Sequence, residues 1–347
     1  MIAIELVDHA WIDNGRGVLC RAAGSQHSQA TAVVCPYYLR TDVVAALVPQ
    51  LAAHTPSLTW RGDRYVKITR LCTPAQWADL VAALPTEHGL HPMAWSLFSG
   101  LAAERWVRVL DPRDALGAAL RAGQGPMVAL LAQLCIALGD PGNAVGLLGL
   151  TGSAALDVTR FDVPCAGTGS DIDLTIYPSV DPDTLRAAVA DVGGQFPAEL
   201  PDTERHRIAY QRSRMMPPTS DENSQAVFWR RRQDLAWIGS LRLDLTRSDP
   251  TGTPAHVLAY ARRPSGGWHA VVTVTAVHDR YPVTLHVEHP DVQRVQITAR
   301  GYQTTLRPGD CLALRGLLHR PVDEPAFASI DDAAGHQITL IQLGETS

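Results

Sequence analysis

The sequence predicts an α+β protein of three units, and three observations lead to this assignment. Residues 1–142 mix β-branched stretches with helical ones, residues 143–262 hold alternating strands with paired carboxylates, and residues 267–345 are almost all strand and turn. The length of 347 residues exceeds that of a usual single domain, and 46% of the residues are hydrophobic, enough for more than one buried core. We therefore expect an N-terminal α/β domain (1–142), a central α+β domain (143–262) and a small C-terminal β-barrel (267–345).

Composition and charge exclude several classes of protein. Lys and Arg number 30 against 35 Asp and Glu, a net charge of -5, whereas proteins that coat nucleic acid are usually basic. Any nucleic-acid contact must then come from a local patch, or the partner is small. Glu5 and Asp8 interrupt the N-terminus too early for a signal peptide, and the apolar stretch Met127–Leu138 is too short to span a membrane. Six scattered cysteines without a CxxC pair favour neither zinc nor disulfides, so we expect a cytoplasmic protein with no membrane contact.

The N-terminal unit is expected to mix strands and helices. Segments rich in β-branched and aromatic residues predict strands, and these segments are MIAIELV, GVLCRAA, ATAVVCPYYL and RYVKITR. Thr41–Ala53 and Thr73–Leu84 predict helices, because each opens with a threonine that can cap it and the second has Pro74 directly after the cap.

The central unit is expected to place several polar side chains on one side of a sheet. NAVGLLGLTGSAAL predicts a strand, a Gly-Ser turn and a helix, and SDIDLTIY predicts a strand with Asp171 and Asp173 on one face. A helix should follow, with Asp181 as its cap and Gly193 as its stop. A later strand, SLRLDLT, sets Asp244 on the face opposite its leucines.

This constellation matches the needs of nucleotidyl transfer. Gly152 permits close backbone approach to a triphosphate, and the Ser153 hydroxyl adds a donor. Asp171 and Asp173 are two positions apart on a strand, so both can bind the same Mg²⁺ (or Mn²⁺) ions. Asp244, a lone carboxylate within an apolar strand, is the candidate for the acceptor side and a third metal ligand. Each element alone is also typical of ordinary turns and solvated strand faces; their combination is the specific signal.

The stretch LTGSAAL…GSDIDLTIY resembles the GS…DxD signature of the DNA polymerase β-like nucleotidyltransferase superfamily. The whole chain more loosely resembles uncharacterised archaeal and bacterial predicted nucleotidyltransferases, which share a motif like GDRYVKI and a small β-rich C-terminal domain. The resemblance implies a polymerase-β-like central fold, phosphate contacts by Gly152 and Ser153, and metal binding by Asp171 and Asp173. In one departure, the gap from Ser153 to Asp171 is longer than usual in the superfamily.

Two basic clusters lie between the predicted Asp173 and Asp244 strands. One contains Arg205 and Arg207, and the other is Phe228-Trp229-Arg230-Arg231-Arg232. Interleaved arginine and aromatic residues suit a triphosphate clamp or stacking on RNA bases, so Arg205, Arg207 and Arg230 are predicted nucleotide contacts. A solvated helix with charge pairs would produce the same pattern.

The C-terminal unit is expected to be a small closed barrel of OB or translation-barrel type. Its five predicted strands are HAVVTVTAV, VTLHVEH, VQRVQITAR, DCLALRGLL and QITLIQL. The unit is acidic and has few aromatic residues for base stacking, so a structural or protein-contact role competes with nucleic-acid binding.

The sequence thus favours a Mg²⁺-dependent nucleotidyltransferase that moves an NMP from an NTP to a hydroxyl, with RNA or tRNA as the expected acceptor. Two alternatives stay open. One is a nucleotide- or RNA-binding module whose transferase site is idle, and the other is a toxin-like or small-molecule nucleotidyl modifier.

Overall fold

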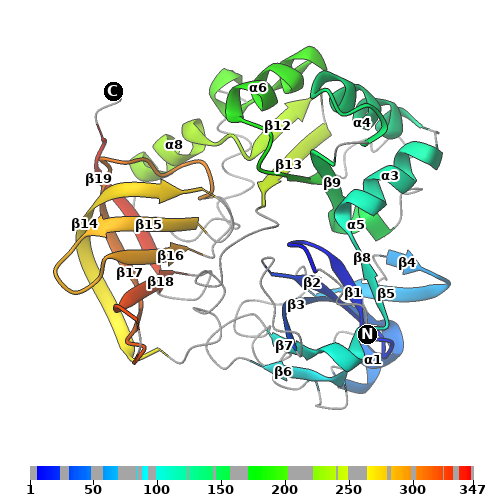
Figure 1. Ribbon diagram of the computed structural model, residues 1–347, viewed down its shortest axis with the longest axis horizontal. Coiled ribbons are helices and arrows are strands. Elements are labelled where there is room, and N and C mark those ends of the chain that lie inside the picture. Colours follow the sequence, from blue (N-terminus) through cyan, green and yellow to red (C-terminus); the bar gives the residue numbers. More distant parts are fainter. Residues whose placement is uncertain are drawn as a thin grey trace.

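The computed structural model contains three sheets and several helices, which confirms the α+β class (Figure 1). It describes residues 6–23, 31–47, 58–68, 84, 88–92, 99–122, 125–143, 146–156, 171–201, 222–239, 241–248, 264–279, 283–297, 302–322, 324–330 and 336–344. Each sheet belongs to one of three successive parts of the sequence, N-terminal, central and C-terminal.

The N-terminal sheet is antiparallel at every pairing that the structure describes. Its strands are β1 (Trp11–Asp13), β2 (Val18–Ala22), β3 (Thr31–Arg40), β4 (Leu58–Trp60), β5 (Asp63–Lys67), β6 (Leu90–Pro92), β7 (Ser99–Ala102) and β8 (Arg108–Leu110). They follow the order β4-β5-β3-β2-β1-β8, with β7 also on β3 and β6 on β7. Three of the predicted strands correspond to β2, β3 and β5. The predicted helix Thr41–Ala53 corresponds to α1 (Thr41–Leu47), and residues 48–53 lie outside the described residues. The predicted helix Thr73–Leu84 lies, apart from Leu84, outside the described residues.

The central sheet has the order β11-β12-β13-β10-β9. Its strands are β9 (Leu148–Thr151), β10 (Asp171–Ile176), β11 (Gly194–Gln195), β12 (Leu235–Ile238) and β13 (Leu241–Arg247). β10 and β13 run parallel, and the other pairs are antiparallel. The helices of this region are α3 (Pro112–Ala122), α4 (Pro126–Ala137), α5 (Gly152–Leu156) and α6 (Pro182–Asp191). As predicted, the Asp181 side chain caps α6 by accepting from two backbone amides, and Gly193 follows its end at φ 75°.

One hydrophobic core joins this sheet to α3, α4 and α6. It is formed by alternate residues of β10 and β13 together with Leu116 of α3, Leu131 and Leu134 of α4, and Leu185 of α6. Because α3 and α4 precede residue 143, the predicted boundary at 142–143 falls within the part of the chain that contributes to this core. No single helix among the described residues has the length and apolar composition of a membrane span; α3 and α4 reach it only as a pair bent by 118°.

The C-terminal region contains a closed barrel of five strands, which confirms the predicted small closed barrel. The strands of this region are β14 (Gly266–His278), β15 (Val283–Glu288), β16 (Arg294–Ile297), β17 (Cys311–His319), β18 (Phe327–Ile330) and β19 (Gln337–Gln342). The barrel closes in the order β14-β15-β16-β18-β17-β14, with β16 and β18 parallel. The predicted strand from Gln337 is β19, which pairs with β17 beside the closed ring, whereas β18 was not anticipated.

Helix α8 (Glu222–Arg231) connects the central sheet to this barrel. Phe228 is fully buried in the barrel core, where its ring meets that of Tyr302 edge to face. Arg231 donates two hydrogen bonds to Asp310, at 2.6 and 3.1 Å, and Asp310 also accepts from the amides of Arg307 and Gly344. The barrel is therefore attached through buried and nearly buried contacts.

Candidate metal and phosphate site

Three carboxylates converge on one face of the central sheet because of the register between β10 and β13. Asp173 lies directly beside Asp244, and Asp171 lies beside Arg242. Ile172, Leu174 and Leu243 alternate with these polar residues and point into the core, so the carboxylates occupy the opposite face. One oxygen from each of Asp171, Asp173 and Asp244 lies within 4.8 Å of the others. Such a group of oxygen ligands can hold a metal ion.

Of the arginines that the structure describes, Arg242 forms ion pairs within this cluster. Its Nη2 donates to the Asp244 carboxylate at 2.7 Å and also forms an ion pair with Asp171. The side chains of Arg242 and Asp244 keep 20% and 24% of their exposure, so the pair is reachable from solvent. A guanidinium thus partly balances a charge cluster that contains three carboxylates.

The Gly152 turn closes directly against this cluster. Gly152 has φ 65°, a left-handed conformation that glycine adopts without strain. A Cβ atom at this position would lie 1.9 Å from Oδ2 of Asp173 and 2.9 Å from its Cβ, closer than real atoms approach. Both the backbone conformation and the contact therefore require glycine, and Ser153 follows half-buried as α5 begins.

The turn is also held from the N-terminal sheet. The indole Nε1 of Trp11 donates to the Gly152 carbonyl at 3.0 Å, and the Thr151 hydroxyl donates to the carbonyl of His9 at 3.2 Å. Leu156 of α5 packs with Trp11 in a cluster that contains Leu19 and Tyr38 of the N-terminal sheet. The backbone of the predicted phosphate turn is thus fixed by residues 141 and 142 positions away in the sequence.

Burial dominates the electrostatics of Asp244. Removal from water raises the pKa of this carboxyl, and the positive charges of Arg242 and Arg232 oppose that rise. A cation bound among the three carboxylates would act in the same direction as the arginines and stabilise the ionised form.

The predicted basic contacts have different outcomes. Arg205 and Arg207 lie outside the described residues, as does the long segment between Leu156 and Asp171. Arg230 is exposed, and its Nε donates to the carbonyl of Ala226 within α8.

The neighbours of Arg230 have structural contacts. Phe228 and Arg231 hold the barrel, and Trp229 packs with Leu200, Leu235 and Trp237. Arg232 makes a bidentate pair with Asp234, at 2.8 and 2.6 Å. These side chains are therefore occupied by contacts within the protein.

Two residues of the site were not anticipated from the sequence. Arg242 has a readable signal, because it precedes Asp244 by two positions and so shares its face of the strand. Trp11 has no local signal, because only the packing of two distant segments brings its indole to Gly152.

Comparison of the chain with protein-family models, with curated proteins and with solved structures finds no match. The residues brought together here are three carboxylates able to hold a metal ion, an arginine between two of them, and a glycine turn against the third.

Proposed function

We propose that this protein is a metal-dependent nucleotidyltransferase that transfers an NMP from an NTP to a hydroxyl group of an RNA or tRNA acceptor. The observation that carries the proposal is the contact between the Gly152 turn and Asp173 within the three-carboxylate cluster. The two halves of the GS…DxD pattern lie well apart in the sequence, one at Gly152-Ser153 and the other from Asp171 to Asp173, yet they meet in space. A turn that binds phosphate beside carboxylates that bind metal is the arrangement that this reaction needs.

The donor set suits Mg²⁺ or Mn²⁺. Both are hard cations that prefer oxygen ligands, and Asp171, Asp173 and Asp244 supply carboxylate oxygens from two adjacent strands. When bound, such an ion neutralises charge on the phosphates and on the leaving pyrophosphate. Arg242 pairs with two of these carboxylates, and a guanidinium is also a group that binds phosphate oxygens.

The protein groups can be assigned to the parts of the reaction. Gly152 and Ser153 would hold the triphosphate through backbone and hydroxyl donors. Asp244 would orient the acceptor hydroxyl and take its proton as the oxygen attacks the α-phosphorus. The bond from the α-phosphorus to the bridging oxygen of the β-phosphate breaks, and pyrophosphate leaves.

For the C-terminal barrel we propose an OB-like fold with a structural role. The closed barrel of five strands, with β16 and β18 parallel, supports this proposal. Phe228 and Arg231 of α8 already bind the barrel to the central region.

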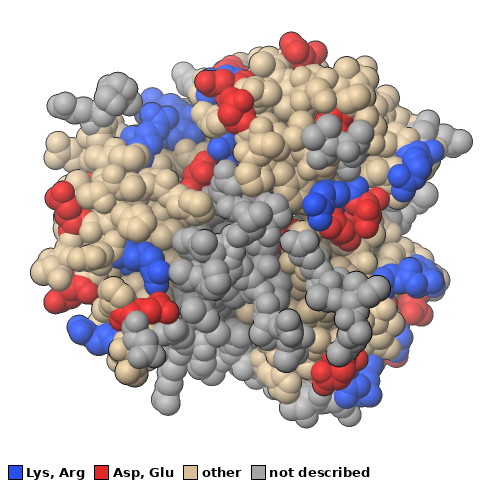
Figure 2. Space-filling model, viewed as in Figure 1, with Lys and Arg blue, Asp and Glu red and all other residues tan. Residues whose placement is uncertain are grey.

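Basic and acidic side chains are interspersed over the described residues on the face in Figure 2, with no broad basic area among them. On that face, this distribution favours local acceptor contacts over a surface coated with nucleic acid.

The decisive experiment incubates the protein with each labelled NTP, Mg²⁺ and total cellular RNA. Labelled RNA and released pyrophosphate are expected from the native protein, and loss of both is expected from the double variant Asp171→Asn plus Asp173→Asn. Asp191→Asn is the matched control, because Asp191 is an exposed aspartate at the end of α6. Unchanged transfer by the double variant would refute the site.

The same experiment separates the two alternatives. NTP or RNA binding without pyrophosphate release would identify an idle binding module. Pyrophosphate release with label on small molecules, and none on RNA, would identify a small-molecule modifier.

A further inference from the structure

A second group of charged and aromatic residues lies on the N-terminal sheet. The ring of Trp11 lies between this group and the Gly152 turn. The Trp11 ring, whose indole bonds to Gly152, lies 5.5 Å from the ring of Tyr37, edge to face. The guanidinium carbon of Arg21 lies 4.6 Å from the centre of the Tyr37 ring, and the Lys67 ammonium lies 4.9 Å from it. Two cations are therefore concentrated around one aromatic ring beside the candidate site.

The strand register explains why these side chains gather. Arg21 of β2 pairs with both Trp11 of β1 and Cys35 of β3, while Lys67 of β5 pairs with Tyr38. A β-bulge in the β2–β3 pairing leaves Tyr37 as the extra residue, which lets it turn toward the same face as Tyr38. That face is the one against which α5 packs.

Arg21 is distinguished by the lack of a counter-charge among the described residues. Arg21 and Arg232 are both buried, each with 7% of its surface exposed. Arg232 has the bidentate carboxylate of Asp234, whereas among the described residues Arg21 has neither an ion pair nor a side-chain hydrogen bond, and its contact is the Tyr37 ring. Burial of a guanidinium without an anion is unfavourable. A ligand that supplies an anion would remove this penalty.

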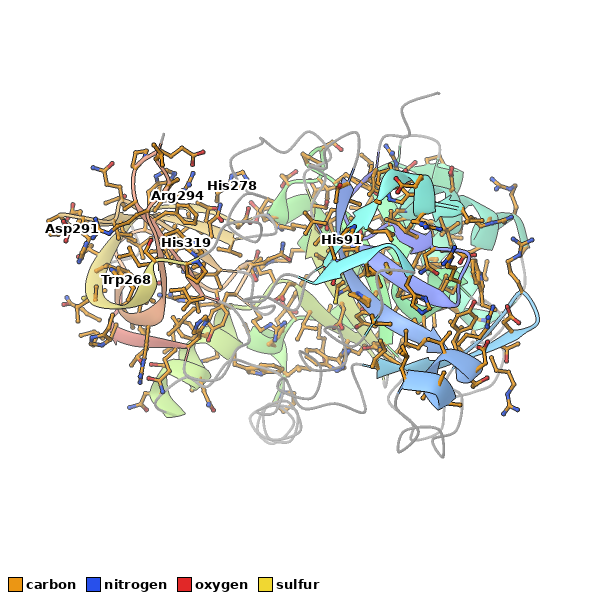
Figure 3. All side chains as sticks on the ribbon, turned by 90° about the horizontal axis from the view of Figure 1, so that it is seen from below. His91, Trp268, His278, Asp291, Arg294 and His319 are labelled. Carbon is orange, nitrogen blue, oxygen red and sulfur yellow. The ribbon has the colours of Figure 1, made fainter. Side chains whose placement is uncertain are left out.

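The barrel contains a similar group in which the arginine is paired with a carboxylate of the protein. The guanidinium carbon of Arg294 lies 4.7 Å from the centre of the Phe327 ring, on which His319 stacks. Here, however, Arg294 also pairs with Glu324 at 3.5 Å. Figure 3 places Arg294 and His319 in the barrel, well apart from His91 of the N-terminal sheet. An arginine on an aromatic ring is therefore not by itself a signal. The difference is that the described part of the chain places no carboxylate in an ion pair with Arg21.

We propose that Arg21 and Lys67, oriented by Tyr37, bind a backbone phosphate of a single-stranded nucleic-acid acceptor. The inference rests on the proposed function and names the surface that presents the acceptor. In the proposed function, the Gly152 turn binds the triphosphate. A second phosphate site next to this turn would suit the nucleic-acid chain that carries the reacting hydroxyl. The half-exposed rings of Tyr37 and Trp60 border the same cluster and offer surfaces for base contacts. A local site of this kind also fits a chain with a net charge of -5.

The test measures binding of a labelled single-stranded RNA oligonucleotide by fluorescence anisotropy, in EDTA and without NTP. Arg21→Gln and Lys67→Gln are each expected to weaken RNA binding roughly tenfold. Each should also reduce the slope of log K against log salt by about 0.7, the value for one lost phosphate contact on a single strand. Arg64→Gln is the matched control, because Arg64 is an exposed arginine on β5, three positions from Lys67 and on the opposite face of the strand.

The outcomes separate this inference from the proposed function. Weakened RNA binding in both variants, with the control and NTP binding unchanged, supports the inference even if no transfer activity is found. RNA binding equal to that of the native protein, weakening by Arg64→Gln to the same extent, or loss of NTP binding in place of RNA binding would overturn it. Lys67 is half-exposed, so Lys67→Gln remains a valid test if Arg21→Gln fails to fold.

Discussion

The acidic side chains of the C-terminal barrel and those of the central sheet differ in how their charges are balanced. In the barrel, the Asp310 side chain is completely buried and accepts two hydrogen bonds from Arg231 and one from each of two backbone amides. In the central sheet, three carboxylates lie within 4.8 Å of one another, and Arg242 pairs with two of them. The first arrangement balances its charge and holds the structure together, whereas the second gathers negative charge where a cation can bind.

The largest effect on stability is expected from Asp310→Asn. The substitution removes the charge that balances nearly buried Arg231, and breaking a buried pair costs about 3–5 kcal/mol of unfolding free energy. Urea denaturation would measure the loss. Asp291→Asn is the control, because Asp291 is exposed in the same region and a change there should stay within about 0.5 kcal/mol. Equal effects of the two substitutions would contradict the structural role of Asp310.

Divalent metal is expected to stabilise the central sheet. At a Mg²⁺ concentration of about 100 times its dissociation constant, binding to the folded chain adds about 2.7 kcal/mol to the unfolding free energy. EDTA should reverse the gain, which thermal or urea unfolding would report. The double variant Asp171→Asn plus Asp173→Asn should show no gain, and an equal gain in that variant would place the metal elsewhere.

Gly152→Ala is expected to cost about 1–3 kcal/mol, the usual cost of one strained residue. Alanine at φ 65° is strained, and its Cβ would also meet Asp173. Gly193→Ala separates the two causes, since Gly193 has φ 75° but a Cβ added there would have no neighbouring atom within 4 Å. We expect the Gly152 variant alone to lose the Mg²⁺-induced stabilisation. If both variants respond to Mg²⁺ like the native protein, the turn does not shape the metal site.

The smallest effect on stability is expected from Asp181→Ala, which removes a carboxylate that accepts hydrogen bonds at the start of α6. Bonds from Thr184 and from backbone amides lower the pKa of Asp181, the cap of α6. A lowered pKa in the folded state means that the stabilisation is present above the unfolded value of about 3.9 and is lost as pH falls. Native protein should therefore exceed Asp181→Ala in stability at neutral pH, and the difference should shrink in acid. A difference independent of pH would mean that the carboxylate charge does not matter at this cap.

Local patterns in the sequence predicted most of the described central elements. Alternation identified β10 and β13, and the cap and stop residues bounded α6, because these signals depend on neighbours along the chain. The face of the three aspartates was readable for the same reason. The β10–β13 register that brings Asp173 beside Asp244 could not be read from the sequence, since pairing of distant strands has no local signature.

Features that depend on long-range contacts could not be predicted from the sequence. Phe228, Trp229 and Arg231 resemble a nucleic-acid contact in sequence. In the structure Phe228 lies in the barrel core, Trp229 packs beside the central sheet, and Arg231 pairs with Asp310. Strand β18, FASI, is four residues long and has no alternating polar positions, because all four of its residues are buried. Short buried strands of this kind are ambiguous from sequence alone.

The shared core of α3, α4 and the central sheet has a consequence for how this protein can be divided. A fragment that begins at residue 143 would lack Leu116, Leu131 and Leu134, which cover one face of the sheet, and Trp11, which fixes the Gly152 carbonyl. Cloning or gene fusion at that boundary would thus expose apolar surface and release the turn. A fragment that keeps the Gly152 turn and the core of the central sheet in their present form must therefore include α3, α4 and the N-terminal sheet.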